Sequence, residues 1–164
     1  MRVGFAGTNG LPFHAIGSDF IARGLLAKGE VTMPAIVDWL KAHPGKAGAL
    51  MALNPRYVFF KPIVGEGPLG AEGVALTPGR SLAVDPEAVP LGSPVWIETY
   101  WPDDPAKPLQ RLVVAQDTGG AIKGAQRADL YWGTGDGAFE KAGRMKSPGR
   151  YAVLLPKAVA GRLP

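Results

Sequence analysis

The pattern of apolar and polar positions changes character near residues 61–68. Before that point apolar side chains recur at helical spacing, most clearly in the stripe formed by Ile36, Val37, Trp39 and Leu40. After it, short apolar runs alternate with Gly and Pro, and helical spacing does not return until Asp136. The change predicts two parts: a small α/β lobe over residues 1–62 and a mainly β domain with some helix over residues 63–164.

The first part has signals for two strands and three helices. Thr32 is expected to cap the strongest helix, because Pro34 follows in its first turn and His43-Pro44-Gly45 ends it. Ser18 is the expected cap of a shorter helix. The expected elements are a strand over 2–6 with a turn at 7–10, helices over 19–26, 32–43 and 47–53, and a buried strand over 57–60.

The second part has short strand signals separated by turn residues, as expected for a chain with 23 Gly and 16 Pro. This spacing is typical of a small barrel or sandwich, here with one embedded helix capped by Asp136. The expected elements are strands over 73–76, 81–84, 94–100, 111–116 and 150–155, and a helix over 136–145.

Composition excludes several kinds of chemistry. The chain has no cysteine, so disulfides, thiolate catalysis and zinc–cysteine sites are excluded. His14 and His43 lie in different segments with no carboxylate at a metal-like spacing, and no metal site is expected. The net charge of +4 suits either an anionic polymer or simple solubility. The basic residues are scattered, without the interleaved aromatic residues of single-strand binders, so no nucleic-acid partner is expected.

The most informative stretch runs from Ala115 to Gly135. An apolar strand leads Asp117 into a glycine-rich loop, and Asp129 follows twelve residues later, directly before Leu130-Tyr131-Trp132. Glycine lets a ligand approach the backbone closely, and a carboxyl beside apolar side chains can become a general acid. The alternative is that both aspartates cap turns or helices. Asp117-Thr118-Gly119 also matches the short motif of aspartic proteases, which would require a homodimer.

Longer motifs match one known family in order along nearly the whole chain. The chain resembles the membrane-bound lytic murein transglycosylase A family, including its three-aspartate domain. The matching segments are Gly4–Gly10, Met33–His43, Asn54–Phe60, Leu76–Pro86, Pro90–Trp96, Ala115–Gly124, Ala128–Gly135, Ala142–Met145 and Gly149–Leu155.

This resemblance implies a fold and a reaction. Residues 63–164 are expected to form a double-psi β-barrel-like domain, complete or incomplete. Residues 1–62 are expected to be a remnant of the lobe inserted into it, together with linking helices. The substrate would be peptidoglycan glycan strands. The enzyme would cleave the β-1,4 bond between N-acetylmuramic acid and N-acetylglucosamine and leave 1,6-anhydromuramoyl ends, without a cofactor. The alternative is a non-catalytic polysaccharide-binding module on the same barrel.

The family's three aspartates correspond to Asp85, Asp117 and Asp129, with Asp129 as the catalytic acid and base. We expect Asp117 to assist and Asp85 to be structural. Substrate would contact the glycine-rich loop and the aromatic pair that follows Leu130; each ring fits sugar stacking or the core equally well. The expected substrate-binding residues are Thr118, Gly119, Gly120, Ala121, Lys123, Tyr131 and Trp132.

The resemblance and the apolar neighbours also predict how the two aspartates differ. An ordinary Asp has a pKa of about 3.9 and holds no proton at neutral pH. Leu130, Tyr131 and Trp132 are expected to desolvate Asp129 and raise its pKa. Backbone N–H groups of Thr118 and the two following glycines are expected to hold Asp117 in its charged form.

The start of the chain predicts a strand and not an export signal, because Met1-Arg2 is followed at once by Val3-Gly4-Phe5-Ala6. Family members act at the periplasmic face of the outer membrane or in the periplasm. They are longer than this chain, and their export or lipid-attachment signal belongs to an N-terminal half for which we expect no counterpart here.

Overall fold

The computed structural model describes residues 3–65 and 67–160. The chain divides into two compact units, Met1–Val64 and Gly65–Pro164, two residues from the boundary expected after residue 62. Arg2, which we expected in the first strand, lies outside the described residues. None of the described helices has the length and apolar character needed to span a membrane.

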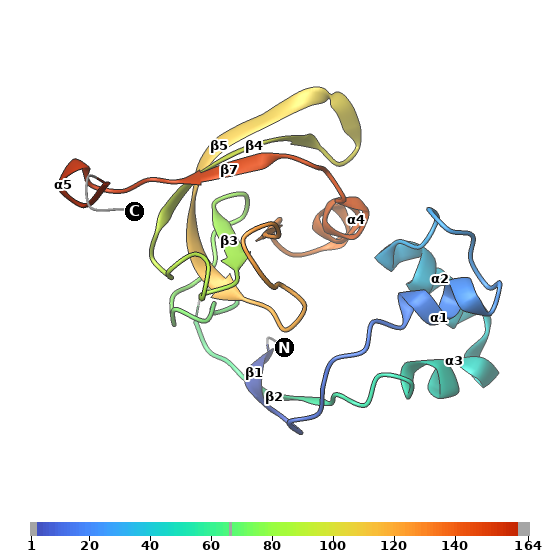
Figure 1. The fold of residues 1–164 in the computed structure, drawn as a ribbon. Coiled ribbons are helices and arrows are strands. Elements are labelled where there is room, and N and C mark those ends of the chain that lie inside the picture. Colours follow the sequence, from blue (N-terminus) through green and yellow to red (C-terminus); the bar gives the residue numbers. More distant parts are fainter. Residues whose placement is uncertain (1–2, 66, 161–164) are drawn as a thin grey trace. The chain divides into compact units, whose positions relative to one another are not determined.

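The first unit combines a two-stranded antiparallel sheet with three helices (Figure 1). Thr32 caps the longest helix as expected, its hydroxyl oxygen accepting a hydrogen bond from the Ala35 N–H at 3.3 Å. Its elements are β1 (Val3–Thr8), α1 (Gly17–Ala22), α2 (Met33–Ala42), α3 (Pro44–Met51) and β2 (Val58–Pro62).

Helix packing forms the core of this unit. Phe20 of α1, Ile36 of α2 and Leu50 of α3 are buried together. The Phe20 ring meets the edge of Trp39 with 5.2 Å between ring centroids, a favoured aromatic geometry. The apolar stripe read from the sequence therefore faces the other two helices.

Three expectations for the first unit are wrong. Ser18 does not cap α1, because the helix begins at Gly17 after Ile16, and the Ser18 hydroxyl instead donates to the Ala15 carbonyl. The helix also ends early, since Gly24 adopts φ +64°, a left-handed conformation suited to glycine. The strand around Phe59 and Phe60 is not buried: these side chains are exposed, because among the described strands β2 has β1 as its single partner.

The second unit is built on a mixed sheet with strand order β6-β3-β5-β4-β7. β3 runs parallel to β5, and the other neighbours are antiparallel. The sheet is open among the described residues, so the molecule is mixed α/β with no closed barrel in that part of the chain. The elements are β3 (Ser81–Val84), β4 (Pro94–Trp101), β5 (Asp104–Thr118), β6 (Asp129–Leu130), α4 (Asp136–Arg144), β7 (Arg150–Val153) and α5 (Lys157–Ala160).

Alternation along the strands creates the core of the second unit. Val95 and Ile97 of β4 are buried while Pro94 and Trp96 are exposed. On β5, Leu109, Val113 and Ala115 are the buried residues. This period of two places one face of the β4–β5 hairpin, prominent in Figure 1, against the core residues of β3 and β6.

Several boundaries differ from the sequence expectation because tertiary pairing decides them. β5 begins at Asp104 and not at Arg111, since β4 pairs with it at Asp104 and from Pro108 onward. Pro108 is tolerated because, among the described strands, β3 joins the other side of β5 only from Val114. Residues 73–76 form no strand beyond a Leu69–Ala75 bridge, because Gly73 makes a turn at φ +81°. Helix α4 is capped by Gly135, leaving Asp136 in the first turn, where a negative charge suits the helix dipole.

We predict that Gly149→Ala destabilises the second unit. A Cβ at Gly149 would clash with the Glu98 carbonyl and lie 2.8 Å from the Thr99 Cβ, where β7 joins β4. Overpacking of this kind costs about 1–3 kcal/mol, measurable as a lower free energy of unfolding in urea. Gly137→Ala in α4 is the control: its Cβ would meet nothing within 4 Å, and helix propensity favours it by roughly 0.5–1 kcal/mol. Equal stability of the two variants would contradict this packing.

Candidate active site

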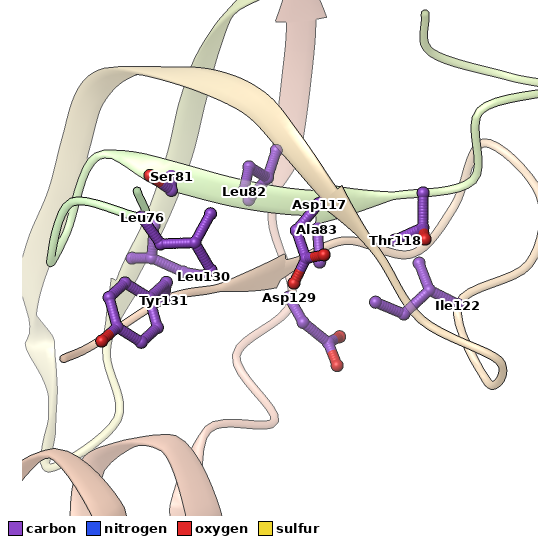
Figure 2. A pocket seen from close by; sticks show the side chains of 10 residues that line it. All are labelled: Leu76, Ser81, Leu82, Ala83, Asp117, Thr118, Ile122, Asp129, Leu130 and Tyr131. Atoms are coloured by element: carbon purple, nitrogen blue, oxygen red, sulfur yellow. The ribbon is translucent and has the colours of Figure 1, made fainter. Parts of the chain in front are cut away.

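Asp117 and Asp129 lie in the wall of one cavity of about 290 Å³ in the second unit (Figure 2). The cavity is formed around β3 by its two neighbouring strands and the loops that follow them. It combines an apolar lining with the two carboxylates and three hydroxyl-bearing residues. The lining residues are Leu76, Ser81, Leu82, Ala83, Asp117, Thr118, Ile122, Asp129, Leu130 and Tyr131.

Strand pairing brings the two aspartates together. Ala83 of β3 is the register partner of Asp117 on β5 and also of Asp129 on β6. Adjacent strands lie about 4.8 Å apart, so the two Asp Cα atoms are roughly 10 Å from each other. Paired residues project to the same face of a sheet, and Figure 2 shows both carboxyl groups on the same side of β3. Ala83, whose side chain is a single methyl group, occupies the strand position between them.

Asp117 is half-buried at the end of β5. Its Oδ1 accepts a hydrogen bond from the Ala71 N–H at 3.0 Å. The expected donors in the glycine-rich loop, Thr118 to Gly120, do not provide this bond; the donor comes from a turn 46 residues earlier in the chain. The carboxylate is therefore held by a backbone donor, as anticipated, but by a different segment.

Asp129 is in a different environment from the one expected. Its side chain is 54% exposed, and the Arg127 guanidinium faces it, with Nε 3.3 Å from Oδ1 and Nη2 3.4 Å from Oδ2. The apolar enclosure that we expected is absent from the described residues. The reason is strand alternation: Leu130, the next residue, enters the core and is 8% exposed, so it does not enclose the carboxyl group of Asp129.

Asp85, directly after β3, is buried and fully engaged with backbone. Its Oδ2 accepts from the Gly124 N–H at 2.7 Å and its Oδ1 from the Glu87 N–H at 3.2 Å. These two hydrogen bonds hold the pKa of Asp85 below its usual value, with a smaller contribution from the positive charge of Lys123 and against the opposing effect of burial. This arrangement fits the structural role expected for Asp85, which ties the glycine-rich loop to the end of β3.

The remaining expected site residues divide into two groups. Thr118 and Tyr131 line the cavity. Trp132 packs against the core instead, with its Nε1 donating to the Met145 Sδ at 3.3 Å. The loop residues outside the cavity lining are Gly119, Gly120, Ala121 and Lys123.

Sequence reasoning missed several residues of the site. Ile122 is 5% exposed and anchors the loop beside the cavity. Ser81 donates to the Gln116 Oε1 at 2.7 Å and accepts from the Thr77 N–H at 2.8 Å, which fixes the cavity floor. For Arg127, the sequence offered one indication, which is its position two residues before Asp129. The others depend on strand pairing, for which the linear sequence carries no direct signal.

The geometry permits proton transfer at Asp129 and polar contacts at Asp117. A cavity with an apolar lining and two separated carboxylates suits a ligand with both hydroxyl groups and apolar faces, such as a sugar. Glycoside-cleaving enzymes of the two-carboxylate type place their carboxyl groups about 5–9.5 Å apart on either side of the bond. In this cavity Asp117 and Asp129 lie on either side of Ala83, the register partner of both.

Comparison with known proteins identifies relatives for both units. The 3D domain model matches residues 80–155, and the MltA specific insert domain model matches residues 1–61. Membrane-bound lytic murein transglycosylase A of Escherichia coli (strain K12) is 37% identical over 97% of this chain. The match covers 45% of that relative, so the chain spans about half the length of the curated protein it matches.

Solved structures show the same relationship. The crystal structure of membrane-bound lytic murein transglycosylase from Agrobacterium tumefaciens superimposes with a TM-score of 0.89 at 36% identity, over 98% of this chain and 45% of that one. Escherichia coli MltA with bound chitohexaose gives a TM-score of 0.85 at 35% identity, over 92% of this chain and 46% of that one.

We predict that Asp85→Asn lowers the free energy of unfolding at neutral pH, because an amide nitrogen cannot accept a hydrogen bond and one of the two donors, Gly124 or Glu87, loses its acceptor. The pKa of Asp85 is lowered by folding, so its ionised form stabilises the fold above about pH 3.9. That contribution is lost as the pH falls through the folded-state value. Urea unfolding at pH 7, 5 and 3 should show a gap between wild type and variant that narrows at pH 3. Asp103→Asn, in an exposed turn, is the control; a gap independent of pH would contradict the assignment.

Proposed function

The chain belongs to the membrane-bound lytic murein transglycosylase A family, and from this premise we propose that it acts as a lytic transglycosylase on peptidoglycan. The bond cleaved is the β-1,4 linkage between N-acetylmuramic acid and N-acetylglucosamine, and the product carries a 1,6-anhydromuramoyl end. The observation that carries the proposal is the cavity around Ala83 with Asp117 and Asp129 in its wall.

One acidic residue is sufficient for this reaction. Asp129 in its protonated form donates a proton to the glycosidic oxygen as the bond to the anomeric carbon breaks. The 6-hydroxyl of the same muramic acid then attacks that carbon, and the Asp129 carboxylate accepts the hydroxyl proton. The proton given in the first step is thereby recovered, and no water, metal or cofactor is consumed. A hydrolase would need a second carboxylate to activate water or attack the sugar.

The exposure of Asp129 means that the bound glycan must supply the apolar enclosure. A half-exposed ion pair such as that with Arg127 contributes about 0–1 kcal/mol, so a sugar can displace the guanidinium at little cost. Covering the carboxyl group then excludes water and favours its protonated form. Catalytic geometry often tightens only when substrate binds.

Asp117 is assigned a second role. Its backbone hydrogen bond from Ala71 fixes the carboxylate on the same face as Asp129, where it can hold a sugar hydroxyl or stabilise positive charge developing at the anomeric carbon. Thr118 and Tyr131 line the cavity and would contact the glycan. The loop residues Gly119, Gly120, Ala121 and Lys123 are proposed to contact its outer part, with Trp132 supporting Tyr131 from the core.

The family membership also supports a proposal for the finer fold and for the location of the enzyme. We propose that the open sheet of residues 63–164 corresponds to part of a double-psi β-barrel, which the parallel β3–β5 pair and the curved β5 support. Residues 1–62 would correspond to the inserted lobe and its linking helices, as the insert-domain match suggests. The relatives are named membrane-bound, which supports action at the periplasmic face of the outer membrane.

A non-catalytic glycan-binding module is the second candidate. The observation that favours it is the exposed, ion-paired carboxyl group of Asp129, since a binder needs no proton donor. The products formed from peptidoglycan distinguish the enzyme from the binding module.

We predict that peptidoglycan treated with the enzyme releases muropeptides lighter by one water than the hydrolytic products, because the 6-hydroxyl replaces water as nucleophile. Mass spectrometry of the soluble fragments measures this directly. The same assay is also run on a hybrid enzyme, in which residues 1–164 of this chain replace the matching segment of the Escherichia coli relative. A lack of activity in the hybrid is informative because the rest of the enzyme is present. Fragments with reducing-end muramic acid alone would identify a hydrolase, and binding without any fragments would favour the module.

We predict different outcomes for substitution of the two cavity aspartates in that hybrid enzyme. Asp129→Asn should abolish turnover and leave glycan binding largely intact, because the amide keeps the shape and has no transferable proton. Asp117→Asn should reduce kcat by about 100-fold or less, as expected for loss of one electrostatic contact. Measurements of kcat and of the glycan Kd test this, and near-normal turnover of Asp129→Asn with none for Asp117→Asn would reverse the roles.

A further inference from the structure

Three cations surround a pair of tryptophans in the second unit, and none of these five residues lines the cavity. Lys107 Nζ lies 4.7 Å from the centroid of the Trp101 ring, Lys141 Nζ lies 5.4 Å from it and Arg111 Cζ 5.7 Å. Lys141 Nζ is also 5.8 Å from the Trp132 ring, and the two indole centroids are 5.3 Å apart. We call Trp101, Lys107, Arg111, Trp132 and Lys141 the cation–indole cluster.

In the part of the chain that the structure describes, no carboxylate is paired with the cations of this cluster. Each cation–π contact contributes about 0.5–1 kcal/mol at an exposed position, and the three like charges repel one another. An anionic group placed among them would remove that repulsion and gain charge-assisted hydrogen bonds.

Two members of the cluster are held in place before any ligand arrives. The Arg111 Nη1 donates to the Gly79 carbonyl at 3.3 Å, and a Cβ at Gly79 would lie 2.6 Å from the same nitrogen. Glycine at position 79 therefore leaves room for the guanidinium. Lys141 is half-buried between the two indoles. Preorganised donors of this kind lose little conformational entropy on binding.

We propose that the cation–indole cluster binds the carboxylates of a peptidoglycan stem peptide, an inference that rests on the proposed function. Muramic acid carries this peptide on its lactyl group, so it accompanies every bond of the kind cleaved. Stem peptides carry more carboxylates than amines and also have alkyl segments. Separate cations around two indole rings match that combination of several carboxylates and apolar stems better than they match a single compact phosphate.

The position of the cluster in the chain supports this occupant. Trp132 directly follows Tyr131, which lines the cavity. The Tyr131 carbonyl accepts from the Gly79 N–H at 2.6 Å, while the Gly79 carbonyl accepts from Arg111. Gly79 thus connects the cavity wall to the cluster through two backbone hydrogen bonds. The cavity around Ala83 and these cations belong to the same unit. A glycan bound over Ala83 would therefore place its peptide branches on the unit that carries the cations.

The four tryptophans make a direct binding test possible. The probe is the synthetic tetrapeptide L-Ala-γ-D-Glu-meso-diaminopimelate-D-Ala, titrated into the nitrogen-15-labelled chain. The indole N–H resonances of Trp101 and Trp132 should shift with saturation. Trp96 is the internal reference, because it lies about 17 Å along β4 from Trp101 and its Nε1 donates to Glu98. Trp39, in the first unit, is a second reference.

A charge-removing variant completes the test. Lys107→Gln combined with Lys141→Gln should weaken the peptide Kd by about tenfold or more, as expected for loss of two charge-assisted contacts. Lys46→Gln on α3, an exposed lysine of the first unit, should leave the Kd unchanged. Thermal unfolding of each variant verifies that the second unit is folded. Inorganic phosphate at matched concentration and ionic strength should not reproduce the indole shifts.

The outcomes separate this inference from the proposed function. Shifts at Trp101 and Trp132 that the double variant removes support the inference even if no anhydromuropeptides are ever formed. Equal shifts at all four indoles, equal shifts with phosphate, or an unchanged Kd in the folded double variant would overturn it. Anhydromuropeptide formation with equal affinity for glycans with and without their peptides would overturn it while leaving the proposed function intact.

Discussion

The backbone pairing of β3 with strands on both of its sides determines the geometry of the site. Ala83 is in register with Asp117 on β5 and with Asp129 on β6, so main-chain hydrogen bonds fix the separation of the two carboxylates. Side chains alternate between faces with a period of two, and a slip of one residue in either pairing would turn one carboxylate to the opposite face. The spacing of the aspartates is therefore a property of the sheet and not of the glycine-rich loop between them.

That loop is in turn tied to the sheet at three points. Ile122 is buried beside the cavity, the Gly124 N–H donates to Asp85 after β3, and the Ala125 carbonyl accepts from the Tyr151 hydroxyl of β7 at 2.8 Å. Glycines give the loop its permissive backbone, and these contacts restrict it. The loop therefore has a permissive backbone that is held in a defined position beside the cavity. A ligand-binding loop requires this preorganisation.

The sequence was sufficient where the signal is local. Thr32 and Pro34 define the start of α2, and alternation over β4 separates its buried from its exposed residues. Sequence reasoning failed where a residue distant along the chain determines the local structure. β6 contains two residues, too few for any periodicity, and exists only because β3 pairs with it. The donor to Asp117 is Ala71, and no local rule names it. The apolar residues after Asp129 were expected to enclose its carboxyl group. They do not, because alternation buries Leu130 and leaves the carboxyl group exposed.

The same alternation links the two charged regions of the second unit. Tyr131 belongs to the cavity wall with the carboxylates, whereas Trp132, the next residue, packs on the core beside Trp101 and Lys141. The two cavity carboxylates thus accompany Tyr131, and the three cations of the cation–indole cluster accompany Trp132. A polymer whose backbone consists of uncharged sugar rings and whose branches carry carboxylates presents the complementary arrangement, since its anionic branches would be repelled from Asp117 and Asp129 and attracted to the cations. Electrostatics would then orient the strand, with the sugars over Ala83, while the contacts inside the cavity decide which bond lies at Asp129.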